Sequence, residues 1–109
     1  MEENILKKYI PMTETIYYVL LALKEERHGY AIIQYISQLT DNRIQMGTGT
    51  LYTMLGRLVD DRLISVVLAD TKKKTYKITP DGDALLQKEL ERLAHQLKNG
   101  EEVYENRYY

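Results

Sequence analysis

The segment of residues 46–64 constrains the fold of this chain more than any other part of its sequence. Its apolar residues recur at helical spacing and predict a helix that turns one face towards a core; they are Leu51, Met54, Leu55 and Leu58. The opposite face carries hydroxyl-bearing side chains and one fork-shaped cation, namely Thr48, Thr50, Tyr52, Thr53 and Arg57. Such groups can lie against a phosphate backbone or reach a base edge, because no negative charge stands in the way.

The residues after this helix predict a hairpin with a basic tip. A short apolar run at residues 64–68 precedes the three consecutive lysines Lys72, Lys73 and Lys74, and a second strand is predicted at residues 75–79. Because side chains alternate along a strand, we expect Tyr76 to point inward and Lys77 outward. The order of helix, strand, basic loop and strand is typical of a recognition helix followed by a wing.

Positive charge gathers in the middle third of the chain. The 109 residues sum to a net charge of −1, but residues 41–80 carry 7 basic and 4 acidic side chains, whereas residues 81–109 carry 4 and 7. Cationic charge therefore lies around the predicted helix and wing. The length fits one domain, and the absence of cysteine excludes disulfides, thiolate chemistry and zinc fingers. A polar amino terminus and the lack of a long apolar run predict a cytoplasmic protein without a membrane span.

Two apolar surfaces are predicted on a first helix that begins after Thr13, the expected N-cap. The inner stripe consists of Ile16, Val19, Leu20 and Leu23. A second surface on the same helix consists of Tyr17, Tyr18 and Leu21. A single small core cannot cover both faces, so we expect the second surface to meet another subunit.

A second helix is predicted to begin at the motif His28-Gly29-Tyr30 and to point three apolar residues inward, Ile32, Ile36 and Leu39. The chain has ten tyrosines but no phenylalanine or tryptophan. We therefore expect the rings of Tyr30 and Tyr76 to take the place of core phenylalanines.

A last helix is predicted to begin at Thr79-Pro80-Asp81, which supplies a cap, a proline at the first helical position and an acid in the first turn. Its leucines step by four, three and four residues, and they are Leu86, Leu90, Leu93 and Leu97. Packing back onto its own domain is one option for this stripe. We expect it instead to pair with a symmetry mate, because the preceding helices and the wing already close a core. The helix is predicted to end at Asn99-Gly100, before an acidic tail that carries tyrosines.

Enzymatic functions find little support in the sequence. The chain has two histidines, no cysteine, no serine beside an obvious base and no glycine-rich phosphate cradle. We expect His28 to serve in packing or in a turn, and Asp60 and Asp61 to lie on the surface. No catalytic residue, bound metal or cofactor is predicted.

Seven motifs occur in a fixed order along the chain. They are residues 13–23, His28-Gly29-Tyr30, residues 49–52, Arg57-Leu58, Leu63-Ile64, residues 76–79 and Gly82. Together they resemble the PadR family of bacterial transcriptional regulators, in its short form with one carboxy-terminal dimerisation helix, over residues 10–98. The combination of His-Gly-Tyr, Gly-Thr-Leu-Tyr and a basic wing is specific for this family, although none of these motifs is specific by itself. The resemblance implies a winged helix-turn-helix dimer, usually a repressor, that a small molecule or a stress signal releases from operator DNA.

The resemblance also assigns residues by position. It places Thr48, Thr50, Tyr52, Thr53 and Arg57 on the recognition helix, Lys73, Lys74 and Lys77 on the wing, and Gln34 on the second helix as a phosphate contact. Some short-form relatives bind flat aromatic drugs in the dimer pore, against a tryptophan of the last helix. This chain has no tryptophan and offers Leu93 instead, which weakens the case for a drug sensor and leaves a small aromatic ligand open.

We therefore expect a mainly α (α+β) protein, a winged helix-turn-helix with a two-stranded wing and a carboxy-terminal dimerisation helix. The expected division is a DNA-binding domain at residues 10–79, a dimerisation helix at residues 80–98 and a tail at residues 99–109. The predicted function is that of a homodimeric repressor on a pseudo-palindromic operator in double-stranded DNA. The alternatives are a winged helix that binds another protein, which the near-neutral net charge favours, and a small-molecule sensor with a secondary DNA role.

Overall fold

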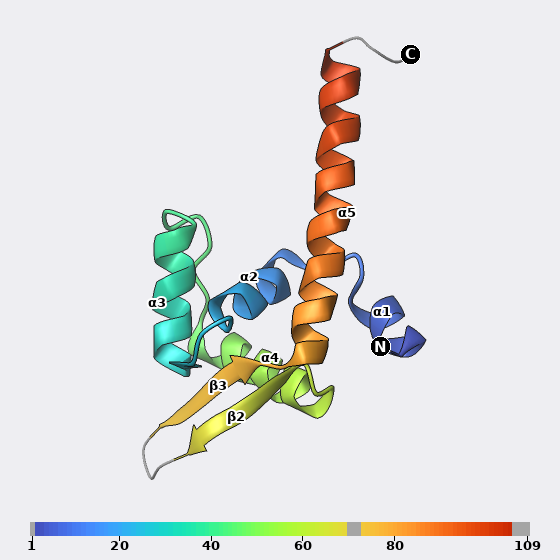
Figure 1. The fold of residues 1–109 in the computed structure, drawn as a ribbon. Helices are drawn as coiled ribbons and strands as arrows, with labels where there is room; N and C mark the ends of the chain where they lie inside the picture. Colours follow the sequence, from blue (N-terminus) through green and yellow to red (C-terminus); the bar gives the residue numbers. More distant parts are fainter. Residues whose placement is uncertain (1, 70–72, 106–109) are drawn as a thin grey trace.

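Five helices and three short strands form the part of the chain that the computed structural model describes, which is residues 2–69 and 73–105 without the side chains of residues 68 and 69. The helices are α1 (Glu3–Tyr9), α2 (Glu14–Ala22), α3 (Gly29–Leu39), α4 (Thr48–Asp60) and α5 (Pro80–Tyr104), and the strands are β1 (Arg27–His28), β2 (Ile64–Ala69) and β3 (Lys74–Ile78). Helices α2 to α4 and the β2–β3 hairpin form a head, from which α5 rises (Figure 1). Three helices followed by a two-stranded hairpin define a winged helix-turn-helix, and the predicted fold class is confirmed.

The sheet has three strands in the order β1-β3-β2, and both pairs of neighbours are antiparallel. In the wing, Val66 lies opposite Tyr76. The short strand β1 sets Arg27 opposite Tyr76 and His28 opposite Thr75. The sequence did not indicate β1, because two residues are too few for a periodic pattern. Since β1 leads directly into α3, it holds the start of α3 against the wing.

Side-chain caps fix where the helices begin. Thr13 accepts a hydrogen bond from the Ile16 amide at the start of α2, as predicted, and Thr79 accepts one from the Gly82 amide at the start of α5. His28 caps α3, because its Nδ1 accepts from the Ala31 amide at 3.4 Å. His28 is therefore a residue of the turn, as the sequence indicated.

The core lies where α2, α3, α4, the inner face of the wing and the first turns of α5 meet. Its largest buried side chains include Leu20, Leu23, Ile32, Ile36, Leu51, Leu55, Leu58, Leu63, Ile64 and Leu85. Leu86 belongs to this core as well, since only 2% of it is exposed. The expectation that Leu86 helps to form a dimer stripe was therefore wrong, because the head already covers this turn of α5.

Gly82 allows α5 to start close to the head. A Cβ atom at this position would collide with the carbonyl oxygen of Leu63 and lie 2.9 Å from Cγ1 of Ile78. The amide of Thr79 also donates a hydrogen bond to the Leu63 carbonyl at 3.0 Å. These contacts fix the first turn of α5 to the start of β2.

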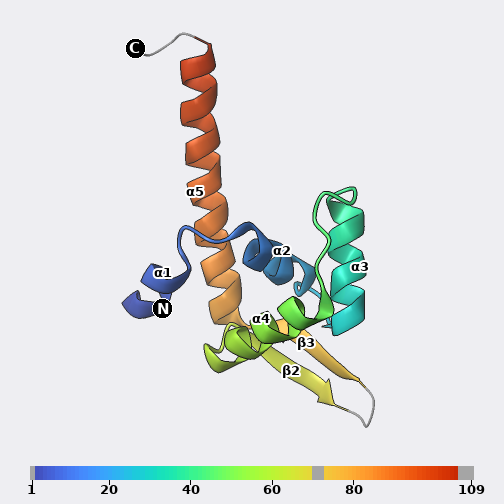
Figure 2. The ribbon, with the colours of Figure 1, turned by 180° about the vertical axis from the view of Figure 1, so that it is seen from behind.

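Helix α5 is one continuous helix of 25 residues, and with it the molecule reaches 59 Å in its longest dimension. Figure 2 shows its second half standing clear of the head. The predicted helix end at Asn99-Gly100 was wrong, because α5 continues to Tyr104. Gly100 inside the helix lowers helix stability by only about 1 kcal/mol relative to alanine. The residues that follow it favour a helix and include no proline. Residues 106–109 of the predicted tail lie outside the described residues.

Two side chains of α3 that were expected in the core are exposed, Tyr30 and Leu39. Tyr30 precedes the buried Ile32 by two residues, which places it about 200° away around the helix. Leu39 is the last residue of α3, where the helix extends past the core (Figure 1). The core role expected of Tyr76 was correct, since its ring is buried.

Candidate nucleic-acid interface

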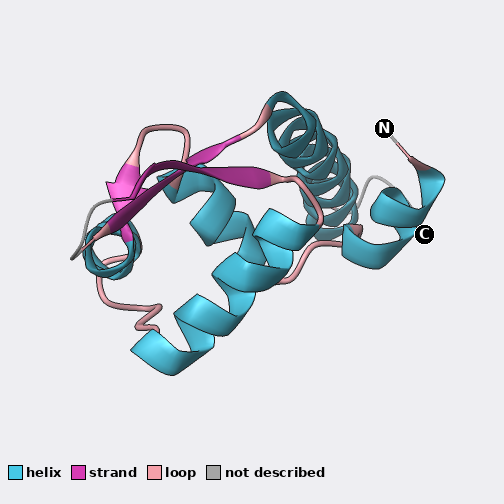
Figure 3. Ribbon diagram, turned by 90° about the horizontal axis from the view of Figure 1, so that it is seen from below, coloured by secondary structure: helices cyan, strands magenta, loops and turns pink. Residues whose placement is uncertain are grey.

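Helix α4 separates an apolar face from a polar one, as its sequence predicts. Leu51, Leu55 and Leu58 are fully buried in the head. The polar residues are all exposed, namely Thr48, Thr50, Tyr52, Thr53 and Arg57. Figure 3 views the molecule from below and shows α4 across the near face, with the hairpin beside it. At Gly49 and Gly56 a Cβ atom would meet no other atom within 4 Å, so the described chain leaves this face open.

The wing places its basic side chains next to α4. Lys73, Lys74 and Lys77 are exposed, and Tyr76 between them points inward, as the alternation predicted. Lys73 and Lys74 line the same hollow as Tyr52 of α4. Lys72 lies outside the described residues. The predicted helix and the described wing lysines therefore share one surface.

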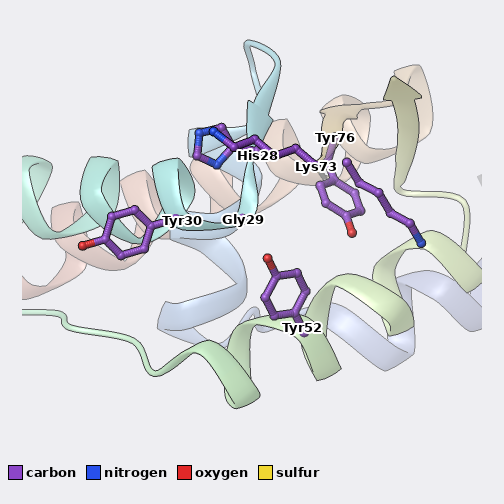
Figure 4. A pocket seen from close by; sticks show the side chains of 7 residues that line it. His28, Gly29, Tyr30, Tyr52, Lys73 and Tyr76 are labelled. Carbon is purple, nitrogen blue, oxygen red and sulfur yellow. The ribbon is translucent and has the colours of Figure 1, made fainter. Parts of the chain in front are cut away.

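A hollow of about 580 Å³ lies between the start of α3, the middle of α4 and the wing (Figure 4). We call it the wing hollow, and it is lined by His28, Gly29, Tyr30, Tyr52, Lys73, Lys74 and Tyr76. Sequence reasoning missed it, because its residues come from three separate elements. In the sequence, His28-Gly29-Tyr30 and Tyr52 belong to two separate motifs, and nothing in either motif indicates that they lie near each other.

A polar cluster joins α1 to the end of α4. The hydroxyl of Tyr9 donates a hydrogen bond to the carboxylate of Asp61, which also accepts from the Lys8 ammonium at 2.7 Å. Burial, and then the bond to Asp61, raise the pKa of Tyr9 to about 12. Lys8 is the main cause of a lowered pKa at Asp61. The guanidinium of Arg57 lies 5.4 Å from the centre of the Tyr9 ring, so this cluster also supports a predicted DNA-contacting residue.

The predicted subunit-contact residues lie on α2 and α5. The rings of Tyr17 and Tyr18 meet edge to face at 5.2 Å, and Leu21 is half-buried beside the core. Along α5, Leu90 is 44% exposed and Leu97 62% exposed, whereas Leu93 is half-buried. A second hollow of about 410 Å³ brings Leu93 together with both tyrosines; it is lined by Met12, Glu14, Tyr17, Tyr18, Glu89, Arg92 and Leu93. We call it the α2–α5 hollow.

A buried carboxylate anchors α5 at this hollow. Glu89 is 1% exposed and accepts from the Arg92 guanidinium through both oxygens at 2.7 Å. Its Oε1 also accepts from the backbone amide of Met12 at 3.2 Å. The Arg92 hydrogen bonds are the main reason that the pKa of Glu89 is lowered. Sequence reasoning missed this contact, because a Glu and an Arg three residues apart on a polar helix usually indicate a solvent-facing pair.

Gln34 is exposed on α3, and its phosphate contact stays a prediction. Among residues 2–69 and 73–105, no cluster of three His, Cys, Asp or Glu side chains could hold a metal ion. Within the same residues, no helix combines the length and the apolar content that crossing a membrane requires.

The fold and the exposed surface of α4 and the wing define a winged helix-turn-helix protein. Residues 18–88 match the family model described as the transcriptional regulator PadR-like family. The match spans more than half of the chain, which therefore belongs to this family of transcriptional regulators. The resemblance found in the sequence motifs is confirmed.

Individual relatives agree with this assignment. An uncharacterised protein of Lysinibacillus sphaericus is 39% identical over 70 residues, which cover 61% of this chain and 64% of that protein. The chain thus spans slightly less than two thirds of that relative. The structure of Bacillus subtilis PadR in complex with operator DNA has a TM-score of 0.62 and 29% identity, covering 73% of this chain and 47% of that one. A PadR family regulator from Eggerthella lenta has a TM-score of 0.64 and 27% identity, covering 89% and 84%.

Proposed function

We propose that this regulator represses transcription by binding, as a homodimer, to a pseudo-palindromic operator in double-stranded DNA. The observation that carries the proposal is the open polar face of α4 beside the lysines of the wing. Family membership supports it, and so does the likeness to Bacillus subtilis PadR, whose structure contains operator DNA.

In the proposed complex, α4 enters the major groove. Threonine hydroxyls and the fork of Arg57 are suited to base edges, and the lysines of the wing to phosphates. Lys73, Lys74 and Lys77 would each displace a counterion from the backbone, so binding should weaken steeply as salt rises. In this arrangement the wing supplies affinity and α4 supplies sequence preference.

The proposed dimer uses the part of α5 that stands clear of the head. Exposed leucines at positions 90 and 97 give two copies an apolar stripe to pair, as two half-sites on DNA require. Gly82 and Glu89 hold α5 to its own head, so the crossing of two α5 helices would set the distance between the two α4 helices.

In this arrangement, a small molecule would relieve repression by changing how the two α5 helices cross, and with it the distance between the two α4 helices. The α2–α5 hollow is the proposed place, since Tyr17 and Tyr18 offer aromatic walls next to Leu93 of α5. We expect a flat aromatic dye to release the protein from DNA, and Tyr17→Ala to lower its affinity for the dye. A dye that binds equally well to this variant would contradict the location.

The test of the main proposal is to select DNA from a random pool with the purified protein and to measure its affinity across a salt series. We expect a preferred sequence with two related halves, and an affinity that falls steeply with salt on both selected and scrambled DNA. A protein that binds no DNA, or binds without salt dependence, would contradict the proposal and favour a winged helix that binds another protein.

A further inference from the structure

Tyr76 has a buried ring, but its hydroxyl opens into the wing hollow. The residue is 6% exposed, and its hydroxyl makes no hydrogen bond to any residue within 2–69 and 73–105. Figure 4 shows this hydroxyl pointing into the wing hollow. Because the hydroxyl is accessible from the hollow and no described side chain engages it, it is available to donate a hydrogen bond to a ligand there. Burial, and then the nearby Tyr52, raise the pKa of Tyr76 above its ordinary value.

Tyr52 reaches the same space from the opposite side. Its side chain leaves α4 and points towards the start of α3, and its hydroxyl ends beside Gly29, the first residue of that helix (Figure 4). A Cβ atom at Gly29 would collide with this hydroxyl and lie 2.8 Å from Cζ of the ring. Tyr52 therefore holds this position only because residue 29 is a glycine. Its hydroxyl, too, has no hydrogen-bond partner within the described ranges.

The groups around the wing hollow suit an anion. Two tyrosines with hydroxyl donors line the hollow, and the exposed, positively charged Lys74 lines the same space. The hollow also lies at the amino-terminal end of the eleven-residue helix α3, where the helix dipole is positive. Within residues 2–69 and 73–105, no acidic side chain lines it. The shared chemistry is that of a phosphate group, whether it belongs to DNA or is free in solution.

The position of the hollow favours a DNA phosphate. It lies between the start of α3 and the wing, on one side of the recognition helix α4. When such a helix enters the major groove, the elements on its sides meet the sugar–phosphate backbone. We propose that the wing hollow binds one backbone phosphate of DNA through the hydroxyls of Tyr52 and Tyr76 and the ammonium of Lys74, and that Gly29 makes room for Tyr52. This inference rests on the proposed function and assigns Tyr52 to the backbone rather than to a base.

The test is to remove each hydroxyl while the ring stays in place, with the variants Tyr76→Phe and Tyr52→Phe. Each should weaken binding to selected and to scrambled DNA by the same factor, about tenfold or more, because a hydrogen bond to a charged group is lost. The salt slope should stay unchanged, since a neutral donor releases no counterion, whereas Lys74→Ala removes one phosphate contact from each subunit and should reduce the slope of the dimer by about 1.8. Tyr35→Phe, the same change on α3 at a ring that lies under Arg27, is the matched control and should bind like the wild type.

Two further measurements separate a binding role from a structural one. Tyr76→Phe should not lower the melting temperature of the free protein, because the hydroxyl that it removes has no protein partner. Gly29→Ala should weaken DNA binding in the wild type but have no further effect in Tyr52→Ala, where the collision is gone. A Gly29→Ala effect that persists in Tyr52→Ala would overturn the role of Gly29.

The remaining outcomes distinguish this inference from the proposed function. A wild type that binds no DNA overturns the proposed function and this inference with it. A wild type that binds DNA, with Tyr76→Phe and Tyr52→Phe equally tight, overturns the inference alone, as does a loss confined to selected DNA. If inorganic phosphate shifts the NMR signals of the Tyr76 ring while Tyr76→Phe binds DNA normally, the hollow serves a free anion and the DNA assignment is wrong.

Discussion

The hydroxyl of Tyr9 donates a hydrogen bond to the carboxylate of Asp61, and this contact ties α1 to the residue that caps the end of α4. Arg57 extends from the last turn of α4 over the Tyr9 ring. The amino-terminal helix therefore supports the end of the recognition helix from which a predicted DNA-contacting side chain projects. Sequence reasoning gave no role to α1, because seven residues are too few to establish a periodic pattern.

The Tyr9–Asp61 bond should make stability depend on alkaline pH. The pKa of Tyr9 is about 12 in the folded chain, against an ordinary value of 10. Because the folded state holds the phenol proton more tightly, this contribution is complete below pH 10 and is lost as the pH rises towards 12. Tyr9→Phe should remove this contribution. The difference in unfolding free energy between wild type and Tyr9→Phe should therefore shrink as the pH rises above 10, by at most about 1.4 kcal/mol per pH unit. Urea denaturation from about pH 8 to about pH 11 measures this, and parallel curves would contradict it.

Arg57→Ala should weaken binding to the selected DNA without unfolding the head. Arg57 is exposed, and the core beneath it is formed by leucines on the other face of α4. Losing a bidentate base or phosphate contact should cost about 1–3 kcal/mol of binding free energy. Gel-shift titration gives the affinity and circular dichroism monitors the fold. Lys98→Ala removes one positive charge from an exposed site on α5 and is the control; equal losses in both variants would mean that Arg57 acts only through net charge.

Arg92→Ala should destabilise the protein at neutral pH, because among the described residues it leaves the buried carboxylate of Glu89 with the Met12 amide as its one remaining donor. An under-satisfied buried charge costs more than the roughly 1–3 kcal/mol of a neutral buried group. The pKa of Glu89 is lowered in the folded chain, so the stability that the pair supplies is present above the ordinary carboxyl pKa and is lost as the pH falls. The difference in unfolding free energy between wild type and Arg92→Ala should therefore be largest near neutral pH and shrink in acid.

The control for this prediction is Lys88→Ala, since Lys88 is an exposed neighbour on α5. It should unfold like the wild type at every pH. A gap between wild type and Arg92→Ala that stays constant down to acidic pH would show that Arg92 acts through packing and not through the charge of Glu89.

The sequence predicted those features whose residues lie within one periodic segment. The two faces of α4 follow from the spacing of Leu51 and Leu55, and the inward and outward sides of β3 from Tyr76 and Lys77. Features that join distant segments were not predictable. Tyr52 and Gly29 meet only because α4 passes below the start of α3, and nothing in the local pattern of either residue indicates that contact.

The leucines of α5 show the same limit on one helix. Leu86 and Leu90 are both leucines of the same predicted stripe, yet the head buries Leu86 and leaves Leu90 exposed. What separates them is how far the head reaches along the helix, which Gly82 fixes by letting α5 begin close to Leu63. The periodicity of a stripe therefore predicts that its residues share a face, but not what covers that face.

This difference gives the sharpest test of the proposed dimer. Leu86→Asp should unfold the head, because it gives up roughly 1.5–3 kcal/mol of apolar burial and places a carboxylate in the core. Leu90→Asp combined with Leu97→Asp should leave the head folded, since both side chains lie outside its core, yet should abolish pairing of the helices. We expect this double variant to be monomeric by light scattering, to keep a wild-type circular dichroism spectrum, and to lose tight binding to DNA with two half-sites. Binding to a single half-site should stay near the wild-type level. A double variant that remains dimeric, or a wild type that is monomeric at micromolar concentration, would refute both the interface and the two-half-site arrangement.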